Sequence, residues 1–328
     1  MTTTSEENKT GIVSNVLGSA TAGIVGRIVT HPLDTAKARL QSLSGASYRG
    51  PADVLVKTFR SEGIQGLYRG FPTVIAGGTP GTIIYLCGYD IFKDHLSSAL
   101  SPFNATKNNK DNEESFVVHF TAGILAETVA CLIYVPVDVI KERLQIQYKT
   151  DAVQYKGGWD ALVKITKTEG PMGIYKGYGA TLASFGPFSA LYFMFYEQFK
   201  SWSKSYIQRN QTITTSTVNE TTTTTTTLPL SFTIVSSASA GAIASFVTSP
   251  LDMAKLRLQV QRGTESSSKT NPSYRGMSDV LAHSYRSGGI PALFRGAGAR
   301  VLHFVPLTTV IMTSYETCRH FFHQTLTQ

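Results

Sequence analysis

The chain has 328 residues, of which 42% are apolar, and its formal net charge is +8 at pH 7. This length would allow two ordinary soluble domains, and the positive charge would allow a nucleic-acid partner. However, 20 of the 30 Lys and Arg residues lie in three connections, at residues 37–70, 141–177 and 255–296. The sequence also contains no RNA-binding aromatic motif and no zinc-ligand spacing. We therefore expect no nucleic-acid partner and no metal site.

The first element along the chain is an apolar segment that ends in a proline and a strip of charge. Asp34, Lys37 and Gln41 stand at i, i+3 and i+7, so they share one face of a helix. Pro32 removes a hydrogen bond from that helix, which predicts a kink. The same spacing recurs twice, with Pro136, Asp138, Lys141 and Gln145 in one copy and Pro250, Asp252, Lys255 and Gln259 in the other.

A second motif follows each basic connection, in a further apolar segment with a proline. In the first copy Pro80 is followed by Tyr89, Asp90 and Lys93. The other copies align without a gap and contain Pro187, Tyr196, Glu197 and Lys200, then Pro306, Tyr315, Glu316 and Arg319. Three copies of two independent motifs indicate three tandem repeats, and repeats decide the architecture.

Each repeat holds two long apolar segments, and each segment is long enough to cross about 30 Å of hydrocarbon as a helix. Polar residues recur along one side, which is typical of helices that line a water-filled cavity. The sequence therefore predicts an all-α membrane protein with six transmembrane helices, in three pseudo-symmetric repeats around a central cavity.

The motifs and changes in composition set the expected boundaries. They are a polar N-terminal tail at 1–10, repeat one at 11–100, a polar linker at 101–114, repeat two at 115–205, a Thr-rich low-complexity linker at 206–229, repeat three at 230–322 and a C-terminal tail at 323–328. The basic connections would lie on the inner side of the membrane. The N-terminal tail has no Arg-rich amphipathic character, so we do not expect it to be a cleaved targeting signal.

These motifs resemble those of the mitochondrial carrier family from about residue 11 to 322. That family has Pro-x-acid-x-x-base at the end of odd helices and aromatic-acid-x-x-base at the end of even ones. The resemblance implies a transporter of the mitochondrial inner membrane, with both termini toward the intermembrane space, that works by alternating access. A self-contained cavity favours a monomer. The chain departs from the family in repeat three, where Gly288-Gly289 replaces an acid-Gly pair.

The resemblance also implies two ion-pair networks that close the cavity in turn, here called the matrix gate and the cytoplasmic gate. The matrix gate consists of Asp34–Lys141, Asp138–Lys255 and Asp252–Lys37, braced by Gln41, Gln145 and Gln259. The cytoplasmic gate consists of Asp90–Lys200, Glu197–Arg319 and Glu316–Lys93, braced by Tyr89, Tyr196 and Tyr315. Aromatic-base-Gly turns at 68–70, 175–177 and 294–296 resemble the family's contacts with the membrane lipid cardiolipin.

Residues that break the threefold symmetry are the candidates for solute contact. The positions equivalent to family contacts on the even helices are Gly77, Gly78, Ser184, Phe185, His303 and Phe304. Arg27 and Glu127 are charged residues inside apolar runs, and such residues are functional by default. The structural alternatives are that Arg27 and Glu127 pair with each other or with helix carbonyls, and that His303 only packs.

The solute is expected to be a small molecule, and we favour an amino-acid-derived or adenine-containing cofactor. Residues 126–143 resemble helix three of S-adenosylmethionine carriers, including the acid Glu127 nine residues before the proline. A carrier of metal or another small cation is an alternative, because iron carriers of the family also lack Arg at the contact positions. A proton leak and a non-transporting docking protein are further alternatives. No catalytic constellation indicates an enzyme, and no cofactor is expected.

Overall fold

The computed structural model describes residues 3–43, 47–104, 111–148, 154–214, 229–262 and 274–327, and these residues form helices and short connections without a strand. The chain divides into two compact units. Unit 1 combines Met1–Asp34, Pro187–Thr248 and Ala297–Gln328, and unit 2 combines Thr35–Gly186 and Ser249–Gly296. Each unit is described separately below.

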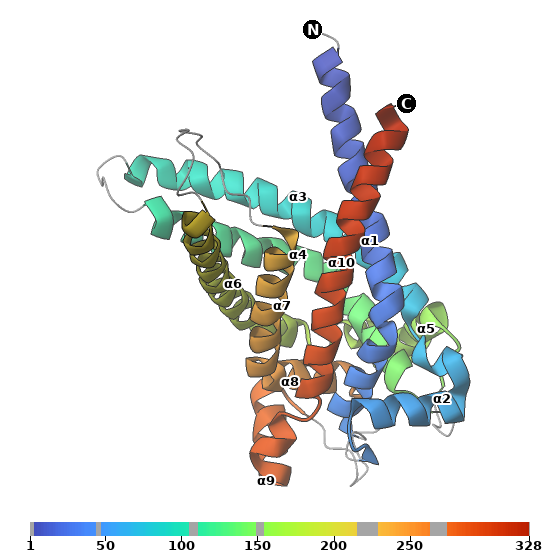
Figure 1. The fold of residues 1–328 in the computed structure, drawn as a ribbon. Helices are drawn as coiled ribbons and strands as arrows, with labels where there is room; N and C mark the ends of the chain where they lie inside the picture. The colour runs from blue at the N-terminus through green and yellow to red at the C-terminus, as the bar shows by residue number, and fades with distance from the viewer. Residues whose placement is uncertain are drawn as a thin grey trace. The chain divides into compact units, whose positions relative to one another are not determined.

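The apolar segments form the long helices (Figure 1). They are α1 (Thr3–Gln41), α3 (Phe71–Asn104), α4 (Asp111–Ile146), α6 (Tyr178–Thr214), α7 (Leu230–Val247) followed by α8 (Ser249–Val260), and α10 (Ala297–Thr327). The basic connections contain shorter helices: α2 (Pro51–Leu67), α5 (Gly158–Glu169) with the 3-10 helix η2 (Pro171–Tyr175), and α9 (Met277–Leu293). The expected kink prolines lie inside continuous helices except Pro250, which follows the break between α7 and α8.

Helical structure extends further than composition indicated. The expected N-terminal tail is helical from Thr3, and α3 continues to Asn104 inside the expected first linker. Likewise α6 continues to Thr214 inside the expected Thr-rich linker. Residues 105–110 and 215–228 lie outside the described part of the chain.

Only part of the predicted membrane topology is visible in hydropathy. Among the described residues, Val118–Ile146 is long and apolar enough to cross a membrane by itself, and Ser231–Val247 with Ser249–Val260 qualifies as a broken pair. The other long helices are less apolar, which agrees with the Gly, Ser and Thr residues along them.

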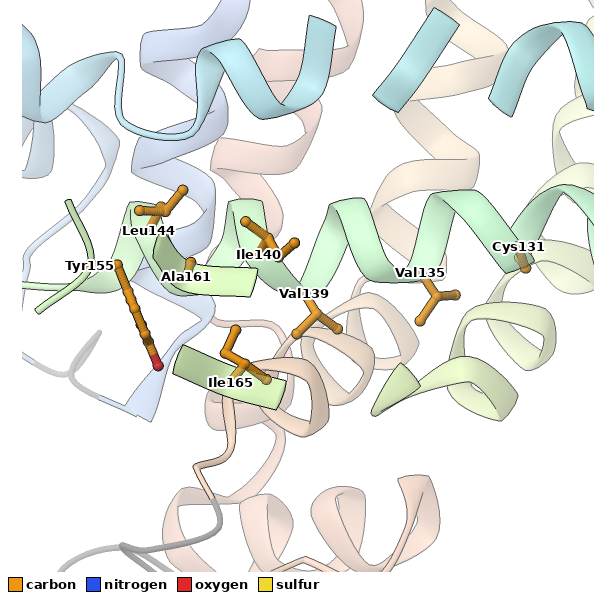
Figure 2. Packing of buried hydrophobic residues seen from close by; sticks show 8 residues of the cluster. All are labelled: Cys131, Val135, Val139, Ile140, Leu144, Tyr155, Ala161 and Ile165. Carbon is orange, nitrogen blue, oxygen red and sulfur yellow. The ribbon is translucent and has the colours of Figure 1, made fainter. Parts of the chain in front are cut away.

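The hydrophobic core of unit 2 lies along α4 (Figure 2). The buried side chains of this cluster are Cys131, Val135, Val139, Ile140, Leu144, Tyr155, Ala161 and Ile165. Val135 and Val139 are one turn apart on α4, and Val139 points toward Ile165 of α5. This packing fixes α5 against the charged end of α4, so the acid at the end of α5 is held in place.

In unit 1, α7 packs against α10 through a glycine. A Cβ atom added to Gly241 would overlap the ring of Phe304. Gly23, in α1 of the same unit, has no atom within 4 Å of an added Cβ. The small residue at 241 is therefore a packing requirement, whereas the one at 23 is not.

We expect Gly241→Ala to lower the free energy of unfolding by about 1–3 kcal/mol, the usual cost of overpacking. Gly23→Ala is the matched control, and it should be neutral or stabilising because alanine favours a helix by up to about 1 kcal/mol. Thermal unfolding of the purified protein in detergent measures both. Equal midpoints for the two variants would contradict the assigned contact.

Candidate transport gate and solute site

Two of the expected ion pairs of the matrix gate are present in unit 2. Lys37 Nζ lies 2.8 Å from Asp252 Oδ2, and Lys255 Nζ lies 2.8 Å from Asp138 Oδ2. They join α1 to α8 and α4 to α8, so all three repeats contribute. The four side chains are 15–30% exposed, which leaves them less screened than surface pairs but not sealed from water.

The third expected pair, Asp34–Lys141, has its members in different units. In unit 1, Asp34 Oδ1 lies 3.9 Å from His303 Nε2. In unit 2, Lys141 Nζ lies 3.2 Å from Glu142 Oε1. The pair stays a prediction.

The three glutamines at the ends of the odd helices are buried. Gln41 Nε2 donates to Asp252 Oδ2 at 3.1 Å, so it touches the Lys37–Asp252 pair as a brace would. Gln145 Nε2 donates to Thr35 Oγ1 at 3.3 Å. The amide nitrogen of Gln259 has no hydrogen-bond partner within the described residues.

A ring of arginines, which sequence reasoning did not identify as functional, connects the same helices. Each arginine lies seven residues after its proline and donates its Nε–H to the carbonyl at the end of the next odd helix. The bonds are Arg39 to Gln145 at 3.0 Å, Arg143 to Gln259 at 3.1 Å and Arg257 to Gln41 at 3.1 Å. Terminal carbonyls lack intrahelical partners and carry the negative end of the helix dipole, so a cation stabilises them.

A buried carboxylate secures this arginine in two of the repeats. Glu62 bridges Arg39 and Arg69, each at 2.8 Å. Glu169 bridges Arg143 at 2.5 Å and Lys176 at 2.6 Å. Burial alone would raise the pKa of the Glu169 carboxyl, but hydrogen bonds from Arg143 and Lys176 hold this pKa below its ordinary value.

The structure describes the side chains of four of the charged residues expected in the cytoplasmic gate. Asp90 is exposed on α3, and Lys93 is half-buried one turn further along. Lys200 Nζ lies 3.1 Å from Glu197 Oε1 on the same helix. The side chains of Tyr315, Glu316 and Arg319 lie outside the described ones. The pairs across this gate stay predictions.

The two described tyrosine braces engage neighbouring rings. The Tyr89 hydroxyl is hydrogen-bonded to His119 Nδ1 at 2.6 Å, and their rings stack. Tyr196 stacks on Tyr192 at 6.0 Å, with Lys200 Nζ 5.5 Å from the Tyr196 ring centroid. His119 escaped sequence reasoning because the equivalent positions of the other repeats are Asn15 and Thr233, so no repeated pattern marks it.

Unit 2 contains most of the candidate solute contacts. Glu127 is half-buried on α4, and the Cys131 thiol lies 3.6 Å from its Oε1 atom. Near this acid, Tyr85 meets the edge of the Phe185 ring at 6.4 Å between centroids. Gly77 and Gly78 lie on α3, and a Cβ atom added to Gly77 would overlap Val137. Ser184 lies on α6, and its hydroxyl donates to the Ala180 carbonyl at 2.8 Å. An acid beside two aromatic rings suits a cationic or planar solute.

In unit 1, Arg27 is half-buried on α1 and has no hydrogen bond or ion pair to another described residue. His303 is tied to α1, because its Nδ1 lies 3.3 Å from the Thr30 carbonyl. Phe304 packs edge-on against Phe188 at 5.7 Å. Within the described ranges, no three His, Cys, Asp or Glu side chains gather as a metal centre would require.

We expect Glu169→Gln to destabilise the protein at neutral pH. Because the folded-state pKa lies below the ordinary 4.5, the ion pairs stabilise fully above that pH and lose their effect as the pH falls through the folded value. The difference in free energy of unfolding between wild type and Glu169→Gln should therefore become smaller below pH 4.5. Thermal unfolding from pH 7 to 3.5 measures this difference, with exposed Asp94→Asn as the control; a difference independent of pH would refute the assigned pairing.

Comparison with known proteins places this geometry in context. The chain matches the family described as mitochondrial carrier protein over residues 8–100, 112–206 and 226–326. Mitochondrial substrate carrier family protein E of Dictyostelium discoideum is 33% identical over 324 residues, which cover 97% of this chain and 98% of that protein. Two proteins of Danio rerio are each 28% identical: mitoferrin-1 over 315 residues (95% of this chain, 85% of that protein) and the mitochondrial S-adenosylmethionine carrier protein over 312 residues (93% and 96%).

The three matched segments each contain one copy of both motifs, as three carrier repeats require. The chain belongs to the mitochondrial carrier family, whose members are transporters of small-molecule solutes in the mitochondrial inner membrane and not enzymes.

Proposed function

We propose that this carrier moves its solute by alternating access through six transmembrane helices, with both termini toward the intermembrane space and the chain acting as a monomer. The observation that carries the proposal is the meeting of charged helix ends from all three repeats, through Lys37–Asp252 and Asp138–Lys255. The described matrix gate, with Asp34–Lys141 as its third pair, would be the closed end of the cavity.

Ion pairs suit a gate that must open in every cycle. Exposed pairs contribute about 0–1 kcal/mol each, and in buried pairs the desolvation penalty offsets most of the Coulomb attraction. The matrix gate and the cytoplasmic gate would therefore differ by only a few kcal/mol in stability. A solute that binds the two states unequally can then shift the population between them.

For the solute we favour an organic cation with a planar ring, such as S-adenosylmethionine. Glu127 would bind the positive charge, while Tyr85 and Phe185 would contact the ring. Arg27 would bind a carboxylate. The similarity to a protein named as an S-adenosylmethionine carrier supports this choice.

A metal cation as solute is the second candidate. It is supported by the similarity to a mitoferrin, and by the Cys131 thiol beside Glu127 in unit 2, since thiolate and carboxylate both bind metal ions.

We also propose a contact with an anionic phospholipid such as cardiolipin. Unit 2 has an open pocket of about 410 Å³ where α6 and α9 begin, and its lining includes Lys176, Gly177, Arg275 and Gly276. Two helix N-termini and two cations there would favour a phosphate group.

The solute proposal predicts ligand-dependent stabilisation of the purified carrier. S-adenosylmethionine at 100 times its dissociation constant should add about 2.7 kcal/mol to the free energy of unfolding. This gain should disappear in Glu127→Gln and Arg27→Ala and persist in Asp94→Asn, which alters an exposed acid. A gain with ferrous or manganous ions instead, also lost in Glu127→Gln, would support the metal candidate, and no gain with either would refute both.

The gate proposal predicts that charge reversal is rescued by its partner. Lys255→Asp places a second acid beside Asp138 and should lower solute uptake into liposomes by roughly tenfold or more. Asp138→Lys combined with Lys255→Asp recreates an opposite-charge pair and should recover much of the uptake. Full uptake in the single variant would refute the gate.

A further inference from the structure

The acid that joins two cations in repeats one and two is absent from repeat three. Glu62 lies four residues after Thr58, and the position four residues after Ser284 is Gly288. The base of the aromatic-base-Gly turn is nevertheless present in all three repeats. It is Arg69, Lys176 and Arg295 in turn.

The arginine of repeat three shares the backbone and hydroxyl contacts of its equivalent in repeat one, lacks the acid and is also hydrogen-bonded to Tyr274. Arg257 donates its Nη1 proton to Ser284 Oγ at 2.9 Å, as Arg39 donates to Thr58 Oγ1 at 3.0 Å. Arg257 is only 6% exposed. Among the described residues, neither Arg257 nor Arg295 has a carboxylate partner, and the two are close enough to repel each other.

The backbone at this position is compatible with the missing acid. In repeat one, a Cβ on Gly66 would overlap Glu62, so the acid requires glycine four residues later. The residue four after Gly288 is Ala292, whose methyl carbon lies 3.0 Å from a Cβ built on Gly288. Ala292 thus fills space beside the stem of the absent side chain, but it supplies no charge between the two arginines.

We propose that Arg257 and Arg295 bind a small oxyanion, with a carboxylate or phosphate group, at the place equivalent to the Glu62 and Glu169 carboxylates. Guanidinium groups suit such ions because they donate two parallel hydrogen bonds. A buried cation without a counter-ion is costly, so an anion at this point compensates Arg257. The anion is either a free ion of the matrix or the headgroup phosphate of a lipid.

The consequence is that repeat three depends on a ligand where the other repeats depend on a side chain. The anion would join α8, through Arg257, to the turn before α10, through Arg295. The inference goes beyond the transported solute, because it concerns Arg257 and Arg295, which are not among the proposed solute contacts.

The decisive variant rebuilds the acid, as Gly288→Glu with Ala292→Gly. Gly288 has an extended φ of −161°, which any residue adopts. In wild type, inorganic phosphate or acetate at fixed ionic strength should raise the unfolding midpoint saturably, by about 3 °C or more. The rebuilt variant should have a higher midpoint without added anion and should lose the response.

Arg295→Gln should also lose the response, which keeps the proposal testable if the rebuilt variant does not fold. Arg69→Gln is the matched control: it removes the equivalent base beside Glu62 and should keep the response. If only cardiolipin-containing micelles stabilise wild type, and the rebuilt variant does not respond, the anion is a lipid phosphate. A response that persists in the rebuilt variant and disappears in Arg275→Gln would overturn the proposal, because the anion then occupies the lipid pocket. No response to any of these additions would overturn it as well.

Discussion

Buried arginines near the ends of α1, α4 and α8 organise unit 2 of this carrier. Each joins its own helix to the terminal carbonyl of the next, so the three repeats are tied in a closed order. The bond combines a full positive charge with the negative end of a helix dipole, and it lies out of water, where screening is weak. The Lys37–Asp252 and Asp138–Lys255 pairs join the same helices, so their side chains meet where the ring brings the helix ends together.

The arginine ring and the lysine–aspartate pairs differ in burial and in the kind of atom that accepts the bond. The arginine side chains are buried and their acceptors are backbone carbonyls, so these bonds do not depend on the rotamer of the acceptor residue. The lysine–aspartate pairs are partly exposed and lie nearer to energetic balance. In the proposed gating mechanism, the lysine–aspartate pairs would open while the arginine bonds persist.

The sequence predicts the three repeats well, because motifs that recur three times cannot arise by chance and their spacing carries their geometry. The gate roles of the residues in these motifs stay predictions. The family prediction is confirmed. The arginine ring is harder to predict, since its acceptors are carbonyls that every residue possesses. His119 occurs in one repeat only, and helix lengths beyond Asn104 or Thr214 do not follow from composition. The identity of the solute is the hardest feature to predict from the sequence. It depends on a few side chains that occur in one repeat only, such as Arg27 and Glu127, and the type of a residue does not specify which solute that residue binds.

The closed order of the ring also constrains how the protein is made. The bond from Arg257 returns to Gln41 across 216 residues, whereas the bond from Arg39 reaches Gln145 across 106. A growing chain can form the bond between its first two repeats early. The carbonyl of Gln41 can bond to Arg257 only after the last repeat has been synthesised. The bond from Arg257 to Gln41 therefore distinguishes a carrier with all three repeats from a chain that ends after its second repeat.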